Sequence, residues 1–107
     1  VCGDGSFQMS MSELATICQH EVPVKIIVME NGRLGMVREV QDRIYEGRHM
    51  ATILDGDPDF VALARAYGIR SALAKSNEEA KKLAAEMLEC DGPYILVCSV
   101  DPETPTI

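Results

Sequence analysis

Two short runs of uninterrupted apolar residues constrain the fold of this chain more than any other feature. They read VKIIVM at positions 24–29 and YILVCSV at positions 94–100, and both are rich in β-branched side chains. A strand with one face in water alternates apolar and polar residues, whereas these runs are apolar at nearly every position. They therefore predict strands buried on both faces, which is typical of a parallel sheet covered by helices on both sides.

Segments with helical periodicity and turn signals separate these strands. The predicted elements, in chain order, are a strand at 1–2, a helix at 6–19, a strand at 24–29, helices at 34–45 and 57–68, a strand at 69–75, a helix at 76–90 and a strand at 94–100. This alternation predicts an α/β fold with a mostly parallel sheet and helices on both faces. Residues 47–57 are polar and irregular, and we expect a loop there.

Capping residues define the ends of two of the predicted helices. In the helix at 57–68, Asp57 is expected to be the N-cap, Pro58 to lie in the first turn and Gly68 to end the helix. In the helix at 76–90, either Ser76 or Asn77 is expected to be the N-cap. Both helices are therefore limited by local signals as well as by their apolar pattern.

Length and charge limit the classes of function. A chain of 107 residues can form one modest domain, and we treat 1–107 as one domain. The net charge is −7 and no segment concentrates Lys or Arg, so a nucleic-acid partner is not expected. The apolar runs are too short to span a bilayer, so no membrane partner is expected either. Four scattered cysteines without a Cys-x-x-Cys pair fit a reducing, cytoplasmic location.

Small and turn-forming residues follow the first two predicted strands. GDGS occupies positions 3–6 and ENGRLG occupies positions 30–35. Ligands of parallel α/β sheets bind at the carboxyl ends of the strands, where Gly3 and Gly5 would let the backbone approach a phosphate closely. Since neighbouring strands end side by side, Asp4 and Asn31 could meet at one Mg²⁺ ion. Asp-Gly and Asn-Gly are also common turn dipeptides, so these residues alone leave a purely structural role open.

The wording of longer segments resembles a known family. GDGSFQMSMSELATI followed by PVKIIVMENGRLGMVREVQ resembles the cofactor motif of thiamine-diphosphate-dependent enzymes. Within that group, LGMV at 34–37, DPDFVALARAYG at 57–68 and DGPYILVCSVD at 91–101 are most similar to the catalytic subunit of acetolactate synthase, also called acetohydroxyacid synthase. The resemblance extends over nearly the whole chain and implies the thiamine-diphosphate-binding fold of the C-terminal domain.

The resemblance implies a role for each residue of the two turns. Asp4, the side chain of Asn31 and the backbone carbonyl of Arg33 would bind Mg²⁺, and Gly3, Gly5 and Ser6 would line the diphosphate. The residues beside the thiazolium ring and the substrate channel would be Leu34, Gly35, Met36 and Val37. Of the six methionines we expect Met36 in this site and most of the others in the core.

Two positions depart from the family pattern. Glu30 stands where the family has the first Asn of an Asn-Asn pair, and we expect its negative charge to alter local binding. Val40 stands where acetolactate synthases have a tryptophan that shapes the substrate channel and a herbicide site. Substrate preference and inhibitor sensitivity are therefore not carried over from the family.

The resemblance also implies what the whole enzyme does. It would decarboxylate pyruvate and join the two-carbon unit to a second 2-oxo acid, in branched-chain amino-acid biosynthesis. The activating Glu is expected in an N-terminal domain of a partner subunit, so no catalytic residue is assigned within 1–107. A homo-oligomer is expected, while FAD and a regulatory subunit are left open.

Three alternatives concern the chain as given. It is expected to be an N-terminally truncated domain whose isolated form is inactive. The parent enzyme could instead be another thiamine-diphosphate-dependent 2-oxo-acid decarboxylase or an oxidase. The chain could also be a non-catalytic module that only self-associates through an uncovered apolar patch.

Overall fold

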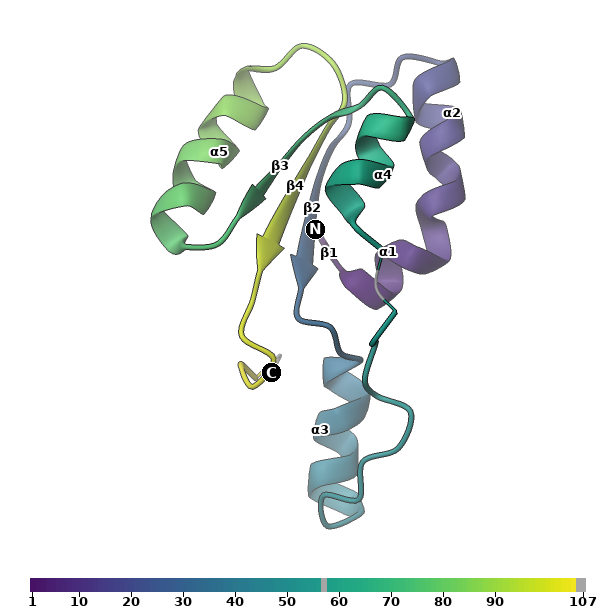
Figure 1. Ribbon diagram of the computed structural model, residues 1–107, viewed down its shortest axis with the longest axis vertical. Helices are drawn as coiled ribbons and strands as arrows, with labels where there is room; N and C mark the ends of the chain where they lie inside the picture. Colours follow the sequence, from purple (N-terminus) through teal and green to yellow (C-terminus); the bar gives the residue numbers. More distant parts are fainter. Residues whose placement is uncertain (57, 106–107) are drawn as a thin grey trace.

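Parallel strands form the centre of the computed structural model, which describes residues 1–56 and 58–105 (Figure 1). The elements are β1 (Cys2–Gly3), α1 (Asp4–Ser10), the 3₁₀ turn η1 (Met11–Glu13), α2 (Leu14–Gln19), β2 (Lys25–Glu30), α3 (Gly35–Ile44), α4 (Phe60–Ala66), β3 (Arg70–Ala74), α5 (Asn77–Glu89) and β4 (Tyr94–Ser99). The described strands make one four-stranded sheet in the order β1-β2-β4-β3, with every pair parallel. The predicted α/β fold and the order of its elements are confirmed.

The two apolar runs are the central strands of this sheet. β2 and β4 pair along their whole length, from Lys25 opposite Tyr94 to Glu30 opposite Ser99. β1 is short and pairs only Cys2 with Val28 and Gly3 with Met29. The short pairing is nevertheless enough to bring the end of β1 beside the end of β2.

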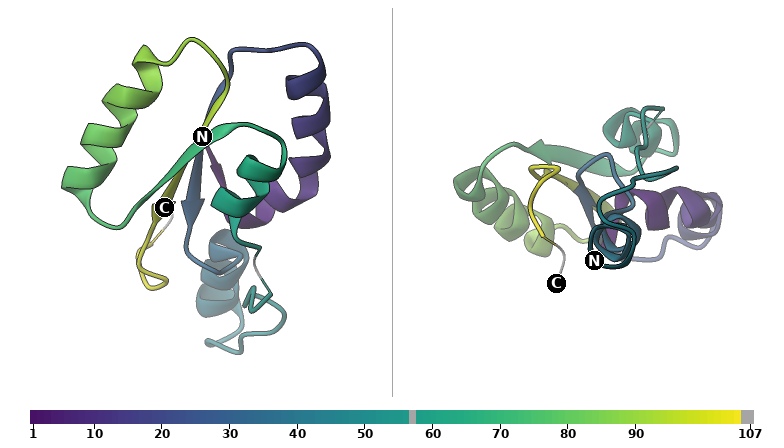
Figure 2. Two further views of the ribbon diagram at one scale, coloured as in Figure 1. Left: turned by 45° about the horizontal axis from the view of Figure 1, so that its top comes forward. Right: turned by 90° about the horizontal axis from the view of Figure 1, so that it is seen from below.

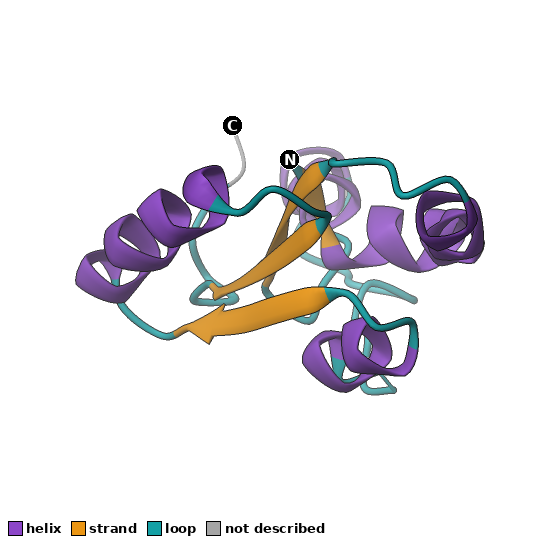
Figure 3. Ribbon diagram, turned by 90° about the horizontal axis from the view of Figure 1, so that it is seen from above, coloured by secondary structure: helices purple, strands orange, loops and turns teal. Residues whose placement is uncertain are grey.

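Helices cover both faces of the sheet, as Figures 2 and 3 show from other directions. Side chains of β4 alternate between the two resulting cores, since successive residues of a strand point to opposite faces. Ile95 and Val97 pack with residues of α1, α2 and α4, whereas Tyr94 and Leu96 pack against α5. In the first core, the rings of Phe7 and Phe60 meet edge to face with centroids 5.3 Å apart.

Several helix ends differ from the sequence prediction. The expected helix at 6–19 begins at Asp4 and is divided into α1 and α2 by the 3₁₀ turn η1. Asp59, whose side chain accepts a hydrogen bond from the backbone N–H of Ala62, is the N-cap of α4, so the prediction for the start of this helix was wrong. The predicted N-cap, Asp57, lies outside the described residues.

Two other ends agree with prediction. Gly68 follows α4 with φ +70°, a left-handed conformation that glycine adopts without strain. Ser76 is the N-cap of α5, where its hydroxyl accepts from the backbone N–H of Glu79. In each case the short-range chemistry of one residue decides where the helix stops or starts.

Helix α3 stands beyond the carboxyl edge of the sheet, away from both cores (Figure 1). It contains no buried residue, and Met36, Val40 and Ile44 are exposed along it. The expectation that most methionines fill the core was wrong, because Met87 is buried and the other five are exposed. No helix in the described part of the chain has the length and apolar character needed to cross a membrane.

Replacing Phe60 tests how far the fold depends on its first core. Phe60 is 1% exposed, and Phe60→Ala should lower the free energy of unfolding by about 3–5 kcal/mol because it removes apolar contacts and leaves a cavity. Met9→Ala is the matched control, since Met9 is 81% exposed and should change stability by less than about 0.5 kcal/mol. Urea denaturation followed by circular dichroism measures both, and equal effects would contradict this assignment of the core.

Candidate functional site

A cavity of about 470 Å³ opens where β1 and β2 end. It is lined by Val1, Cys2, Gly3, Asp4, Gly5, Ser6, Met29, Asn31, Arg33, Leu34, Gly35, Met36 and Val37. All ten residues that the sequence proposed for the site are among them. The structure therefore brings together the two turns that are separated by more than twenty residues in the chain.

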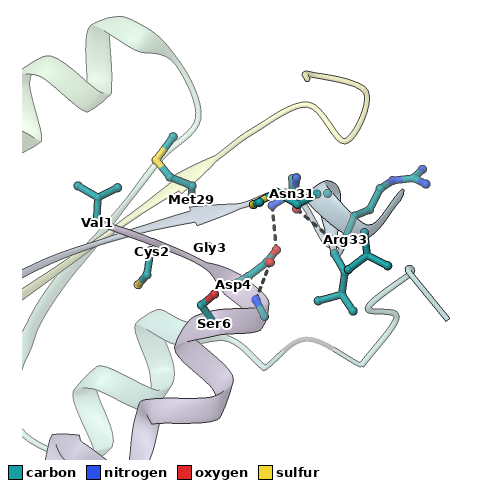
Figure 4. Close-up of a pocket in the computed structure, with 13 residues that line it drawn as sticks. Val1, Cys2, Gly3, Asp4, Ser6, Met29, Asn31 and Arg33 are labelled. Atoms are coloured by element: carbon teal, nitrogen blue, oxygen red, sulfur yellow. Dashed lines mark hydrogen bonds between the residues drawn. The ribbon is translucent and has the colours of Figure 1, made fainter. Parts of the chain in front are cut away.

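Asp4 lies at the centre of this arrangement. Its side chain is 2% exposed and makes hydrogen bonds to both turns, as Figure 4 shows. Oδ1 accepts from the backbone N–H of Gly5 at 2.7 Å, and Oδ2 accepts from the N–H groups of Asn31 at 2.9 Å and Gly32 at 2.7 Å. These three amide hydrogen bonds join the start of α1 to the loop after β2 through one carboxylate.

The loop after β2 owes its shape to Asn31 and Gly32. Oδ1 of Asn31 accepts from the backbone N–H of Arg33 at 3.0 Å, which closes a tight side-chain turn. Gly32 has φ +64°, where a side chain would be strained, and its N–H is the second loop donor to Asp4. The structural role of the Asn-Gly turn is thus realised, and the same turn directs two amides at Asp4.

Residues 52–54 support the loop after β2 through backbone contacts with residues 32–34. Leu34 donates its N–H to the carbonyl of Thr52, Leu54 donates to the carbonyl of Gly32, and Arg33 pairs with Ile53 in an isolated antiparallel bridge. Thr52 is only 2% exposed. Sequence reasoning predicted a plain loop here and missed this support. The apolar pair Ile53-Leu54 inside a polar segment was the available signal.

Gly5 lies in close contact with the side chains of Leu34 and Leu54. A Cβ atom at this position would lie 2.7 Å from Cδ2 of Leu34 and 3.4 Å from Cδ1 of Leu54. A Cβ atom essentially never lies within 3.0 Å of a non-bonded carbon, so a larger residue at position 5 must displace the end of the Leu34 side chain. Leu34, in the loop after β2, therefore packs directly against Gly5 of α1. Leu34 also forms a wall of the cavity.

The oxygen atoms of this site suit a hard divalent cation. A carboxylate has about four acceptor positions, and three of those on Asp4 are used by amides, which leaves one on Oδ1. Oδ1 of Asn31 likewise keeps one position after accepting from Arg33. Within the described ranges Asp4 makes no ion pair with a Lys or Arg, so its buried charge has no protein cation. Carboxylate and amide oxygens with spare acceptor positions are ligands that Mg²⁺ prefers.

Arg33 presents its side chain away from Asp4 (Figure 4) and towards the C-terminal segment. Its Nη2 lies 3.3 Å from Oε1 of Glu103, and Arg38 binds the same carboxylate with two hydrogen bonds of 3.0 and 2.9 Å. The hydrogen bonds from Arg38, aided by the charges of Arg38 and Arg33 and opposed by desolvation, lower the pKa of the Glu103 carboxyl below its ordinary 4.5. The same hydrogen bond raises the pKa of the Arg38 guanidinium.

The two departures from the family pattern lie outside this cavity. Glu30 lines a separate cavity with residues of α4, since alternation along β2 turns Met29 to one face and Glu30 to the other. Val40 is half-exposed on α3 and does not line the first cavity. Three further residues line the first cavity and were not predicted from the sequence: Val1, Cys2 and Met29. Of these, Met29 could have been predicted from the alternation of side chains along β2.

Comparison with known proteins gives a consistent set of relatives. Residues 1–98 match the family model described as thiamine pyrophosphate enzyme, C-terminal TPP binding domain. The chain is 40% identical over 101 residues to the acetolactate synthase isozyme 2 large subunit of Escherichia coli, covering 94% of this chain and 18% of that protein. It is 38% identical over 104 residues to a probable acetolactate synthase large subunit of Methanococcus aeolicus, covering 97% of this chain and 17% of that protein.

A solved structure agrees in fold. The thiamine diphosphate-dependent 4-hydroxybenzoylformate decarboxylase of Rhodococcus jostii superposes with a TM-score of 0.84 at 28% sequence identity, over 92% of this chain and 19% of that one. The chain thus spans less than a fifth of the length of each of these relatives.

Gly5→Ala should move Leu34 while leaving the domain folded. The new methyl group displaces the Leu34 side chain, whereas the helix propensity of alanine in α1 offsets the strain, so unfolding free energy should change by less than about 1 kcal/mol. Methyl NMR shifts of Leu34 and urea denaturation measure the two effects. Gly92→Ala is the control, since no atom lies within 4 Å of its added Cβ and Leu34 should not respond.

The ion pairs of Glu103 with Arg33 and Arg38, here called the Glu103 cluster, should weaken over a defined range of acidic pH. Because the carboxyl pKa is lower in the folded state than in the unfolded state, the ion pairs stabilise the fold above about pH 4.5 and this contribution is lost as pH falls through the lowered pKa. In an NMR titration of the Glu103 side chain, Arg38→Gln should raise the midpoint towards 4.5. An unchanged midpoint would show that Arg38 does not bind this carboxylate in solution.

Proposed function

The chain belongs to the thiamine pyrophosphate enzymes, whose C-terminal TPP-binding domain it contains, and on that premise we propose that its cavity holds the Mg²⁺–diphosphate end of the cofactor in an enzyme of the acetolactate synthase type. The observation that carries the proposal is the buried carboxylate of Asp4. It lies in the cavity, has no cationic partner among the described residues, and keeps an acceptor position on Oδ1.

The charges explain why a cation is needed. A diphosphate in this cavity would lie next to the Asp4 carboxylate, and two anions in a buried site repel each other strongly. A divalent cation bound to oxygens of Asp4 and Asn31 removes that repulsion and binds phosphate oxygens at the same time. The third protein ligand would be the backbone carbonyl of Arg33, which belongs to the same loop.

Each side of the cavity has a separate task in this proposal. Gly3, Gly5 and Ser6 would line the diphosphate; Gly3 and Ser6 are exposed at the start of α1, whereas the N–H of Gly5 is already donated to Asp4. Leu34, Gly35, Met36 and Val37 would form the wall towards the reacting end of the cofactor and the substrate. Thiamine diphosphate, when bound, supplies the carbon centre that cleaves and joins 2-oxo acids. The residues of this chain named above would hold and orient it.

The degree of similarity favours the synthase over the related decarboxylases. Identity to the Escherichia coli acetolactate synthase isozyme 2 large subunit is 40%, whereas identity to the structurally similar 4-hydroxybenzoylformate decarboxylase is 28%. We therefore assign pyruvate as donor and a second 2-oxo acid as acceptor, in branched-chain amino-acid biosynthesis. Another thiamine-diphosphate-dependent decarboxylase or an oxidase is the alternative enzyme.

The remaining properties of the enzyme are part of the same proposal. The activating Glu is placed outside 1–107, the location is the cytoplasm and FAD is left as an optional cofactor of the full enzyme. A homo-oligomer is supported by the exposed apolar side chains of α3, which nothing in the described chain covers. Whether the enzyme also has a regulatory subunit as a partner is left open.

Titration calorimetry of thiamine diphosphate into the 107-residue chain, with and without Mg²⁺, tests the proposal. Binding should require Mg²⁺, and Asp4→Asn should weaken it at least about tenfold because the variant keeps the volume of the side chain but removes the charge that binds the metal. Asp91→Asn is the matched control, since Asp91 also precedes a glycine in a turn but lies outside the cavity.

Two results would contradict the proposal. Binding that is unaffected by Mg²⁺, or equally weakened by both substitutions, would show that Asp4 does not bind a cofactor metal. Absence of binding by a wild-type chain with the circular dichroism spectrum of a folded α/β domain would show that this cavity does not hold the cofactor by itself. The inactive, self-associating module would then be the better description of this polypeptide.

A further inference from the structure

We propose that Glu103 is a positioning residue for the loop 31–34, which it holds in place through Arg33 and Arg38 from outside the cavity. The inference rests on the proposed function for its link to the cofactor, since Arg33 is the residue whose backbone carbonyl would bind the metal. Glu103 itself does not line the cavity.

One carboxylate, that of Glu103, binds arginines on both sides of the start of α3. Arg33 precedes α3 by two positions, and Arg38 is in its first turns. Oε1 of Glu103 lies 3.0 Å from Nη1 of Arg38 and 3.3 Å from Nη2 of Arg33, while Oε2 lies 2.9 Å from Nη2 of Arg38. A two-pronged guanidinium–carboxylate contact fixes orientation as well as distance.

Glu103 is itself held close to the sheet by backbone and side-chain hydrogen bonds of residues 100–104. Val100 continues the pairing of β4 with β2 by donating its N–H to the carbonyl of Glu30 at 2.8 Å. Asp101 then accepts from the backbone N–H of Glu103 through Oδ1 and from that of Thr104 through its carbonyl, each at 2.9 Å. This turn presents Glu103 to α3 only a few residues after the strand ends, so the carboxylate is anchored to a rigid element.

Helix α3 has few other contacts with the rest of the described chain. It contains no buried residue, and Figure 1 shows it beyond the edge of the sheet with the C-terminal segment beside its start. The loop 31–34 is bound to Asp4 on one side and to residues 52–54 on the other, through backbone hydrogen bonds. The Glu103 cluster adds a third direction of support, from β4.

The ion pair between Arg33 and Glu103 should influence how tightly the cofactor binds. The guanidinium of Arg33 extends away from Asp4 (Figure 4), so we expect its ion pair to act on the cofactor by restraining the backbone of residue 33. A loop held in its binding conformation before the ligand arrives loses less conformational freedom on binding. Removing the restraint should therefore weaken binding and loosen the loop while the rest of the domain stays as it is.

Glu103→Gln tests the inference, because the variant keeps the length of the side chain but removes its charge. Amide hydrogen exchange in the free chain should be about threefold faster at Gly32, Arg33 and Leu34, and Mg²⁺-dependent affinity for thiamine diphosphate should fall about threefold, the scale of an exposed ion pair. High salt should remove both differences. Glu86→Gln is the matched control, since Glu86 pairs with Lys82 on α5 and should change neither quantity.

Exchange at 32–34 that equals the control would overturn the inference, and so would faster exchange with an unchanged affinity. The exchange experiment contains no cofactor, so it separates the two proposals. Faster exchange in a chain whose wild type binds no cofactor would leave Glu103 as the residue that positions this loop and would count against the proposed function alone. Arg33→Gln combined with Glu103→Gln should add nothing to the exchange rate if Arg33 is the connection.

Discussion

The site and the first two strands depend on one buried charge. Asp4 follows directly after β1 and accepts amide hydrogen bonds from the loop that follows β2. Two residue pairs are the whole of the β1–β2 register, so the carboxylate supplies much of the connection between these elements. A buried carboxylate that lost these donors would be costly, which is why the loop and the start of α1 keep one relative position.

The arrangement of the loop follows from that anchor. The amides of Asn31 and Gly32 can point at one oxygen because Gly32 has a positive φ and the Asn31 side chain turns the backbone back on itself. Leu34 then packs over Gly5, which lacks the Cβ that would collide with it. Glycine at position 5 therefore lets Leu34 take up its observed position, whether or not a ligand is bound.

The alternation of strand residues separates two neighbouring chemical environments. Met29 lines the proposed cofactor cavity, while Glu30 turns to the face covered by α4, although the two are adjacent in the chain. The family departure at Glu30 therefore places its charge in another cavity, not among the residues expected to bind the metal. The departure at Val40 lies on the exposed part of α3, where its effect depends on what covers that helix.

Local patterns in the sequence determined the α/β class, the order of the elements and the burial of the two apolar runs, because strand burial and turn residues are short-range features. The ten residues proposed for the site came from the resemblance of the segments around GDG and ENG to a known family, and the structure places all ten around one cavity. Tertiary structure alone decided the rest. The support of the loop by Thr52 and the ion pairs of Glu103 with Arg33 and Arg38 depend on which segments meet in space. Periodicity reports only whether a residue faces an apolar or a polar environment, and it does not report which distant partner supplies that environment.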